Sequence, residues 1–379
     1  MLTIIELLPI LQVEGILNNS LYCLFRRGLV YVFHSKTLKL MSALCSFPLV
    51  RPCIRPRYCQ SRRQHISDQV DHIFGYWSAK YILIGLHSQH TQSRAEQGKI
   101  ETLASDEDLV RESDYIFSIV PPRDALATAQ RIVKVLKENT GIRTTPLYYL
   151  DLNAVSPCSA REIANLFQDP SLVIPIDGGI IGGAPQLKTD TTATSTMSRH
   201  TDSASDWYRP SIPQSGPHKL IDSPKSGQHL AELLKVRHIS DEIGQASGLK
   251  MCFAATTKGF MALVIQSFTT ASQLGVLDEL KKEMGQLTPA ALQNAERGIP
   301  GVPPKAYRWV REMEEIAATF SEGGFDKDVF TGISKVYKTM ADDTVLGLEK
   351  TGHRNRGTTA DDVALAMGEG LQAVKKKSE

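Results

Sequence analysis

Two lysines on one long apolar segment are the residues of this chain that could carry out acid–base chemistry. Lys250 and Lys258 lie in the stretch 241–268, where apolar residues fall on every face of a 3.6-residue helix, so we expect a helix that is buried nearly all round. They are eight residues apart, which separates them by about 80° around the helix axis. No aspartate or glutamate occurs between Glu242 and Asp278, so neither lysine has an acidic partner nearby in the sequence.

A lysine on such a helix has two ordinary roles. It can lay its alkyl stem on apolar surface and keep its ammonium group in water. Where it is desolvated, it can act as an acid, a base or a substrate contact. The elements that precede the helix decide between these interpretations.

The composition is that of a globular protein with room for two domains. The chain has 379 residues, 42% of them hydrophobic, and a formal net charge of +2. A charge this close to balance gives no argument for nucleic acid or membrane binding, so we expect neither partner. We expect a cytoplasmic protein, with the mitochondrion as the alternative.

The first 78 residues differ from the rest. No acidic residue lies between Ile16 and Ser67, while arginines and lysines are scattered through that segment. Its apolar runs are too short to span a bilayer. We predict for 1–78 an atypical basic segment that is disordered or resembles a transit peptide. Four of the six cysteines lie here without a C-x-x-C pair, so no metal site is predicted.

From Lys80 onward, apolar strand candidates alternate with helical patterns. The strand candidates are 81–86, 114–122, 146–153 and 172–179, and amphipathic stretches at 124–139 and 156–167 separate the last three. This alternation is typical of an α/β fold, in which helices cross over between parallel strands.

The carboxyl ends of three of these strands carry turn-forming or polar residues. Ligands of parallel sheets bind outside the carboxyl ends of the strands, so three such ends at one edge predict a site. They are Val120-Pro121-Pro122, Asp151-Leu152-Asn153 and Asp177-Gly178-Gly179.

The remainder divides into a loop and a helical domain. Residues 186–228 are rich in Ser, Thr, Asp and Pro and predict a surface loop insertion, within which 207–217 is apolar enough to dock on the domain. The sequence from 241 to 379 reads as helical. We therefore predict a sheet domain over 79–240 and an all-helical domain over 241–379.

Four motifs in this order resemble the β-hydroxyacid dehydrogenase superfamily, which includes 6-phosphogluconate and 3-hydroxyisobutyrate dehydrogenases. The resemblance is strongest to its subgroup of NAD-binding phosphogluconate dehydrogenase-like proteins and covers roughly residues 90–355. It implies a Rossmann-like sheet domain followed by an all-α C-terminal domain. The motifs are SDYIFSIVPP (113–122), DLNAVSP (151–157), PIDGG (175–179) and GQASGLK (244–250).

The resemblance implies an NAD(P)-dependent oxidoreductase that acts on a small β-hydroxyacid or related CH–OH substrate, and that forms a homodimer through its helical domain. Lys250 matches the general acid/base of the family. The cofactor is NADP or NAD. The acidic or basic residue that would choose between them is expected near Leu86-His87-Ser88, and this stretch has neither a clearly acidic nor a clearly basic side chain. The implied substrate-binding residues are Asp177, Gly178, Gly179 and Lys258, and the implied cofactor-binding residues are Val120, Pro121, Pro122 and Asn153.

The sequence departs from the family pattern in three ways. The family's asparagine four residues after the lysine is Ala254 here, so that contact is missing or comes from Lys258 or Thr257, and a serine of the substrate loop is Asp177. The family's opening G-x-G-x-x-G does not occur, so the first βα unit is degenerate. Two alternatives to the dehydrogenase therefore stay open: an imine reductase-like enzyme, and a non-catalytic family member with no functional cofactor site.

Overall fold

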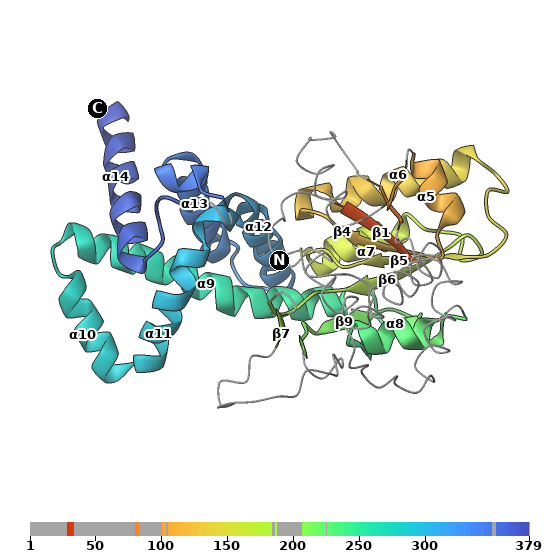
Figure 1. Cartoon of the computed structure of the whole chain (residues 1–379), viewed down its shortest axis with the longest axis horizontal. Helices are drawn as coiled ribbons and strands as arrows, with labels where there is room; N and C mark the ends of the chain where they lie inside the picture. The colour runs from red at the N-terminus through yellow and green to blue at the C-terminus, as the bar shows by residue number, and fades with distance from the viewer. Residues whose placement is uncertain are drawn as a thin grey trace, which may run out of the picture.

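The computed structural model describes residues 105–183, 207–224, 226–350 and 354–378, together with short pieces at 29–33, 80–82, 101–103 and 186–187. A sheet flanked by helices forms one half of the molecule and a group of helices forms the other, and the long helix α9 (Gln245–Gln273) runs from the first into the second (Figure 1). This arrangement confirms the predicted α/β domain followed by an all-α domain.

Three adjacent parallel strands form the centre of the sheet. They are β4 (Tyr115–Ile119), β5 (Leu147–Asp151) and β6 (Val173–Gly178), which pair β4 with β5 and β5 with β6. The crossovers are α6 (Ala125–Glu138) and α7 (Pro157–Asn165), and α5 (Asp106–Glu112) precedes β4. All five residues of β4 are buried, as a strand covered by helices on both faces requires.

On one side of this centre the sheet continues with two further strands. β9 (Ile212–Ser215) pairs antiparallel with β6, and β10 (Val236–Ser240) pairs parallel with β9. β9 is buried and lies inside the segment 186–228 that was predicted to be a loop insertion, so this part of the segment is a sheet strand and not a surface loop. Residues 188–206 of that segment lie outside the described residues. Helix α8 (Gly227–Leu233) connects to β10, and β7 (Gln186–Leu187) pairs with β8 (Trp207–Tyr208).

On the other side, the strand beside β4 runs against it. β1 (Leu29–Phe33) pairs antiparallel with β4, and β2 (Lys80–Ile82) and β3 (Glu101–Thr102) complete the order β10-β9-β6-β5-β4-β1-β2-β3. In a doubly wound dinucleotide fold this position belongs to the first strand, which is parallel to its neighbour. The other residues of the basic segment 1–78 lie outside the described part of the chain.

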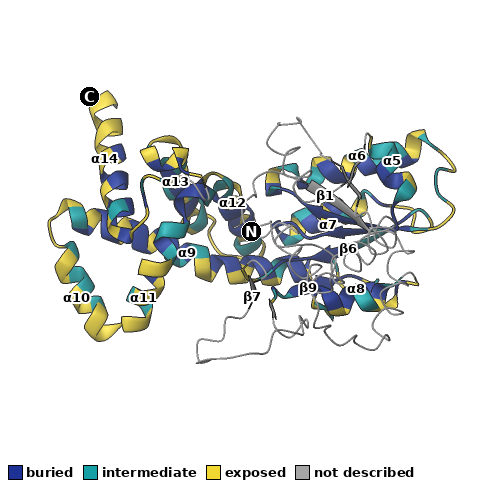
Figure 2. Cartoon of the chain, viewed as in Figure 1, coloured by how far each residue is buried: buried dark blue, intermediate teal, exposed yellow. Residues whose placement is uncertain are grey.

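The helical domain packs around α9. Its other helices are α10 (Leu277–Leu287), α11 (Pro289–Gly298), α12 (Ala306–Glu322), α13 (Asp328–Asp342) and α14 (Ala360–Ser378). α10 has no buried residue and lies with α11 at the outer end of the domain, where Figure 2 shows mostly exposed positions. By length and composition alone α9 could cross a membrane, and core helices of other proteins pass the same criterion.

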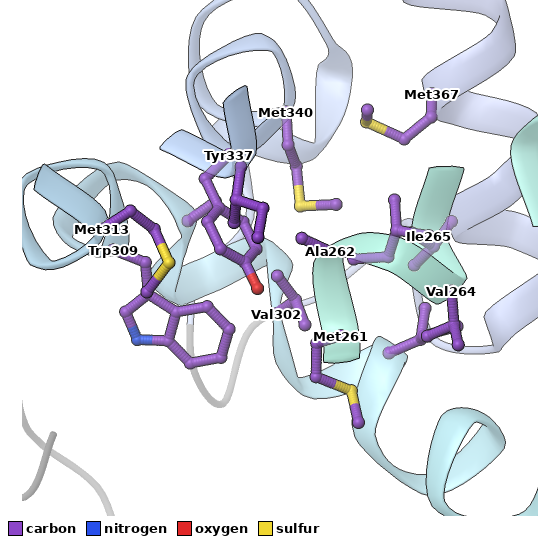
Figure 3. Packing of buried hydrophobic residues seen from close by; sticks show 14 of the residues in the cluster. Met261, Ala262, Val264, Ile265, Val302, Trp309, Met313, Tyr337, Met340 and Met367 are labelled. Atoms are coloured by element: carbon purple, nitrogen blue, oxygen red, sulfur yellow. The ribbon is translucent and has the colours of Figure 1, made fainter. Parts of the chain in front are cut away.

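A single apolar cluster holds α9 against α12, α13 and α14. Trp309 and Tyr337 meet edge to face, with ring centroids 5.2 Å apart. Met261, Met313, Met340 and Met367, from four different helices, belong to the same cluster (Figure 3). Edge-to-face aromatic pairs and flexible thioethers both suit an irregular core. The middle of α9 is therefore packed against helices α12, α13 and α14.

Candidate active site

The carboxylate of Asp177, at the end of β6, anchors the start of α9. Its Oδ2 accepts hydrogen bonds from the backbone N–H groups of Gly244 (2.9 Å) and Ser247 (3.3 Å) and from the hydroxyl of Ser215 (2.6 Å), and its Oδ1 accepts from the Ser247 hydroxyl (2.5 Å). The first N–H groups of a helix have no partner within the helix, and an anion suits that end. The acceptor sites of Asp177 therefore bind α9, a role different from the substrate contact that the motif predicted.

Two glycines allow close packing at the end of β6, one of them against α9. A Cβ on Gly179 would lie 3.0 Å from both Cβ and Cδ of Lys250, and a Cβ on Gly178 would lie 2.6 Å from Leu152 Cδ2. The turn before α9 also needs glycine, because Gly244 has φ +101°. The stem of Lys250 therefore crosses the carboxyl end of β6, next to the glycine pair. A substrate contact by these glycines stays a prediction.

Lys250 is a desolvated amine. The residue is only 4% exposed, and among the described residues its Nζ has no hydrogen-bond partner. Burial lowers its pKa to about 8. Glu312 and Asp151 favour the charged form, while Lys258 and Arg308 oppose it. A lysine with this pKa holds and releases a proton near neutral pH, as acid–base chemistry requires.

Lys258 has a buried acidic partner from another helix. Its Nζ lies 2.5 Å from Oε2 of Glu312 in α12, and the Glu312 side chain has no exposed surface. The same ammonium lies 5.1 Å from the centre of the Trp309 ring. Burial lowers the pKa of Lys258, with Glu312 opposing. Burial by itself would raise the pKa of Glu312, and the Lys258 ammonium is the largest of the opposing effects that together hold that pKa low.

A hydrogen-bonded network joins the ends of β4 and β5. Asn153 accepts from the backbone N–H of Val120 (2.6 Å) through Oδ1, and its Nδ2 donates to Ser118 Oγ (2.9 Å) and to Asp151. Burial raises the pKa of Asp151 to about 7, with Asp177 on the adjacent strand adding to the effect while Asn153 and Lys250 oppose it. Within the described residues, Oδ2 of Asp151 has no hydrogen-bond partner.

The structure places the other predicted residues at the same edge. Val120 and Pro122 are buried and Pro121 is half-buried, where the short helix η2 (Pro122–Asp124) contacts α12. Ala254 is buried one turn beyond Lys250. Thr257 is exposed and donates to the Phe253 carbonyl (3.2 Å), so its hydroxyl does not take the place of the family's asparagine.

The two domains are tied together beside the site. Glu315 of α12 accepts from the backbone N–H of Ser156 (2.9 Å) and from the hydroxyl of Ser159 (2.9 Å), at the N-terminus of α7. Arg161 of α7 pairs with Glu322 of α12. These contacts hold α12 against the carboxyl ends of the strands.

Sequence reasoning identified Lys250 but missed the charged residues around it. Glu312 and Arg308 lie more than fifty residues after the lysine, and nothing local in the sequence connects them to it. The amphipathic pattern of 304–324 gave one usable signal, because two glutamates, Glu312 and Glu315, fall on its buried face. In the described part of the chain, buried polar atoms without a hydrogen-bond partner occur here on Asp151, Lys250, Arg308, Trp309 and Glu312.

No group of three potential metal ligands occurs among the described residues. The arrangement offers a desolvated amine at the edge of a parallel sheet, and the charges of Glu312 and Asp151 favour its protonated form. Such a site can take a proton from a bound hydroxyl or give one to a bound carbonyl or imine.

Comparisons with known proteins found a family model, a relative and solved structures that are similar to this chain. A family model described as a domain of unknown function, DUF1932, matches residues 271–340, and that domain is a C-terminal domain of hydroxyacid dehydrogenase-like proteins. An uncharacterized 28.5 kDa protein of Methanothermus fervidus is 27% identical over 197 residues, 51% of this chain. The chain spans 62% of the length of that relative.

Three solved structures are similar to this chain. The conserved protein MTH1747, of unknown function and structurally similar to 3-hydroxyacid dehydrogenases, is 21% identical over 69% of this chain and 86% of its own, with a TM-score of 0.42. The 3-hydroxyisobutyrate dehydrogenase of Mycobacterium tuberculosis is 12% identical over 73% and 87%, with a TM-score of 0.46. An imine reductase of Myxococcus stipitatus in complex with NADP+ is 15% identical over 78% and 92%, with a TM-score of 0.40.

Each of these TM-scores is below 0.5, so the fold rests on the strands and helices of the chain itself. The resemblance to hydroxyacid dehydrogenase-like proteins that the four motifs predicted is confirmed as a resemblance.

Proposed function

We propose, from this resemblance and from the buried amine at the strand ends, that the chain is an NAD(P)-dependent oxidoreductase that acts on a small β-hydroxyacid or related CH–OH substrate. The observation that supports the proposal most directly is Lys250: its Nζ is buried, without a hydrogen-bond partner among the described residues, and its pKa is lowered to about 8. A structural lysine would keep its ammonium group in water or in an ion pair.

Lys250 would act as the general base and acid. Its neutral amine takes the proton of the substrate hydroxyl during oxidation and returns it to the carbonyl oxygen during reduction. Glu312 and Asp151 stabilise the ammonium that forms, and burial ensures that it gives up its proton again. A nicotinamide cofactor, when bound, supplies the hydride acceptor or donor.

The residues at the sheet edge fit one half of such a cofactor. Val120, Pro121, Pro122 and Asn153 would hold the nicotinamide half, since the unpaired Oδ2 of Asp151 and the Asn153 network mark a polar edge there. For the pyrophosphate half, the sequence has no glycine fingerprint, and β1 runs antiparallel to β4. Without that glycine-rich turn, cofactor binding would be weaker, and this supports the non-catalytic alternative.

The alanine in place of the family's asparagine bears on the choice of substrate. The side chain of Ala254 has no polar atom where the family pattern has an asparagine, so recognition of an anionic group would pass to the cations Arg308 and Lys258. An imine substrate needs no such contact, which is the reason to keep the imine reductase alternative.

A direct titration of the purified full chain with NADH and NADPH, followed by energy transfer from protein to nicotinamide fluorescence, tests the proposal. Micromolar binding, and turnover of β-hydroxyacids that Lys250→Met abolishes, would support it. Turnover of cyclic imines but not of hydroxyacids would favour the reductase. Absence of binding at millimolar cofactor would favour the non-catalytic alternative.

We further propose that the chain forms a homodimer through α9, with the cytoplasm as its location. Four apolar side chains lie within about 80° of one another around the axis of α9 and are 40–70% exposed: Leu249, Phe253 and Leu263 of the helix, and Leu274 directly after it. An uncovered apolar stripe on a core helix suits a second copy of the same helix. Light scattering would show a dimer that Leu263→Glu dissociates, and a monomeric wild type would contradict the proposal.

A further inference from the structure

Four polar side chains form a row across the sheet at the carboxyl ends of its strands. Strand pairing places Ser118 beside Asp151, Asp151 beside Asp177, and Asp177 beside Ser215. Paired residues on neighbouring strands point to the same face of a sheet, so the four side chains share one face. All four residues are buried, with at most 5% of their surface exposed. We call Ser118, Asp151, Asp177 and Ser215 the polar row.

The polar row faces the start of α9. Asp177 accepts hydrogen bonds from two backbone N–H groups at the start of that helix, and the Ser215 hydroxyl accepts a third (2.9 Å). Lys250, on the same helix, packs its stem against Gly179, two residues after Asp177. A group bound at Asp151 would therefore lie on the same face of the sheet as the proposed acid–base residue.

Asp151 is the member of the polar row that has an oxygen without a partner. Its Oδ1 accepts from the backbone N–H of Asn153 (3.1 Å) and from the Asn153 side chain. Both oxygens of Asp177 accept hydrogen bonds, and the hydroxyls of Ser118 and Ser215 are bonded as well. Among the described residues, Oδ2 of Asp151 has no hydrogen-bond partner. Because buried polar atoms are nearly always paired in folded proteins, this oxygen indicates a bound group.

The fold does not need a carboxylate at this position. An asparagine would offer the same Oδ1 to Asn153 and would have no charge to desolvate. Burial, with a contribution from Asp177 on the next strand, raises the pKa of Asp151 to about 7, so its ionised form is disfavoured in the folded protein. A buried acid that destabilises its own ionised form, in a row that is otherwise fully paired, is typical of a functional residue.

We propose that Asp151 binds the carboxamide of the nicotinamide ring, with Oδ2 as the acceptor for the carboxamide NH2 group. The inference rests on the proposed function, and Asp151 is not among the four cofactor-binding residues that the motifs predict. Asn153 connects it to them. Its Oδ1 accepts from the backbone N–H of Val120 (2.6 Å), at the strand end expected to pack on the ring, and its Nδ2 donates to Asp151. The acceptor is thereby held next to the proposed nicotinamide site.

The chemistry of the ligands favours the carboxamide over the substrate. The hydroxyl of a β-hydroxyacid gives its proton to Lys250 in the proposed mechanism. Its carboxylate has only acceptors, and the carboxylate of Asp151 would repel it. The carboxamide keeps two N–H donors throughout the reaction. An unpaired acceptor at Asp151 therefore fits the cofactor better than the substrate.

Calorimetric titration of the full chain with two oxidised dinucleotides tests the contact without any turnover. One is NAD+ or NADP+, and the other is its 3-acetylpyridine analogue, in which a methyl group replaces the NH2 of the carboxamide and the carbonyl remains. At pH 8.5, where Asp151 is ionised, we expect the carboxamide cofactor to bind about tenfold more tightly. Equal affinity in the wild type would overturn the proposal.

Asp151→Asn should remove this preference. The asparagine keeps an oxygen for Asn153 and places an NH2 group where Oδ2 was, so the acceptor becomes a donor that both dinucleotides can use through their carbonyl. The matched control is Asp124→Asn, a half-exposed acid at the start of α6, which should leave the preference unchanged. If Asp151→Asn weakens both dinucleotides by the same factor, the preference persists and Asp151 does not bind the carboxamide.

The wild type provides a second measurement that needs no variant. At pH 5.5 Asp151 is protonated and donates to the carbonyl that both dinucleotides share, so the preference should fade. The charged groups that act on Asp151 are Asp177 of β6 and Lys250 of α9. A change in their charge affects the two dinucleotides alike, because these differ only at the carboxamide. A preference of the same size at pH 5.5 and 8.5 would reject Asp151 as the acceptor.

Failure of the contact and failure of the proposed function give different results. Binding of both dinucleotides with equal affinity would reject the contact and keep the oxidoreductase. Absence of binding by either one at millimolar concentration would reject the proposed function and this contact with it.

Discussion

Replacing Lys250 by methionine should stabilise the protein at neutral pH while it removes the proposed acid–base group. The pKa of Lys250 is lowered from the ordinary lysine value of 10.5 to about 8, mainly by burial. At roughly 1.4 kcal/mol per pH unit, holding this ammonium in the folded protein costs about 3 kcal/mol at pH 7. Methionine has a similar length and no charge to desolvate, so most of that cost disappears.

The effect should depend on pH in a defined direction. Below pH 8 the lysine is protonated in both the folded and the unfolded chain, so the folded state bears the full cost. Between pH 8 and 10.5 the folded state has released the proton that the unfolded state still binds, so the cost fades as pH rises. The stability advantage of Lys250→Met should therefore be largest near pH 7 and vanish toward pH 10.5.

Urea unfolding at pH 7, 8, 9 and 10, followed by circular dichroism, measures this difference. Lys137→Met, at an exposed position of α6, is the matched control and should change stability by less than about 0.5 kcal/mol. A Lys250→Met protein that is less stable than wild type at pH 7, or whose advantage stays constant up to pH 10, would refute the reasoning.

Three further outcomes follow from the site. Asp177→Ala leaves four buried donors without their acceptor at the start of α9, so it should lower the free energy of unfolding by at least about 3 kcal/mol. A loss below ~1 kcal/mol in urea unfolding would show that the start of α9 does not depend on this carboxylate. Gly244→Ala puts a Cβ on a residue with φ +101°, 3.2 Å from Pro157, so it should lower the free energy of unfolding by about 1–2 kcal/mol and lower the melting temperature. An unchanged melting temperature would contradict this. The pKa of Asp151 is raised from 3.8 to about 7, so its contribution to stability is complete below pH 3.8 and is lost as the pH rises to 7, by up to about 4 kcal/mol. Asp151→Asn should flatten this decline in the free energy of unfolding, measured in urea between pH 4 and 7. An equally steep decline in the variant would assign the effect to other groups.

Local patterns in the sequence determined the elements and the proposed acid–base residue. The apolar runs that end at Val120, Asp151 and Asp177 predicted three parallel strands with their carboxyl ends at one edge, and those strands are β4, β5 and β6. The motif around Lys250 predicted the start of α9. These inferences succeed because strand and helix periodicity, turn residues and capping depend on neighbours within a few positions.

The tertiary structure decided which residues meet. Asp177 binds the N-terminus of α9 seventy residues later, Glu312 reaches Lys258 from α12, and Ser215 enters the sheet from a segment that reads as a loop. Each is a contact between elements far apart in the chain, which periodicity does not encode. Burial, which lowers the pKa of Lys250, likewise arises only when α9 packs against β6 and α12. The sequence therefore determined that a lysine stands at the strand ends, and the packing of two domains decided that it is desolvated.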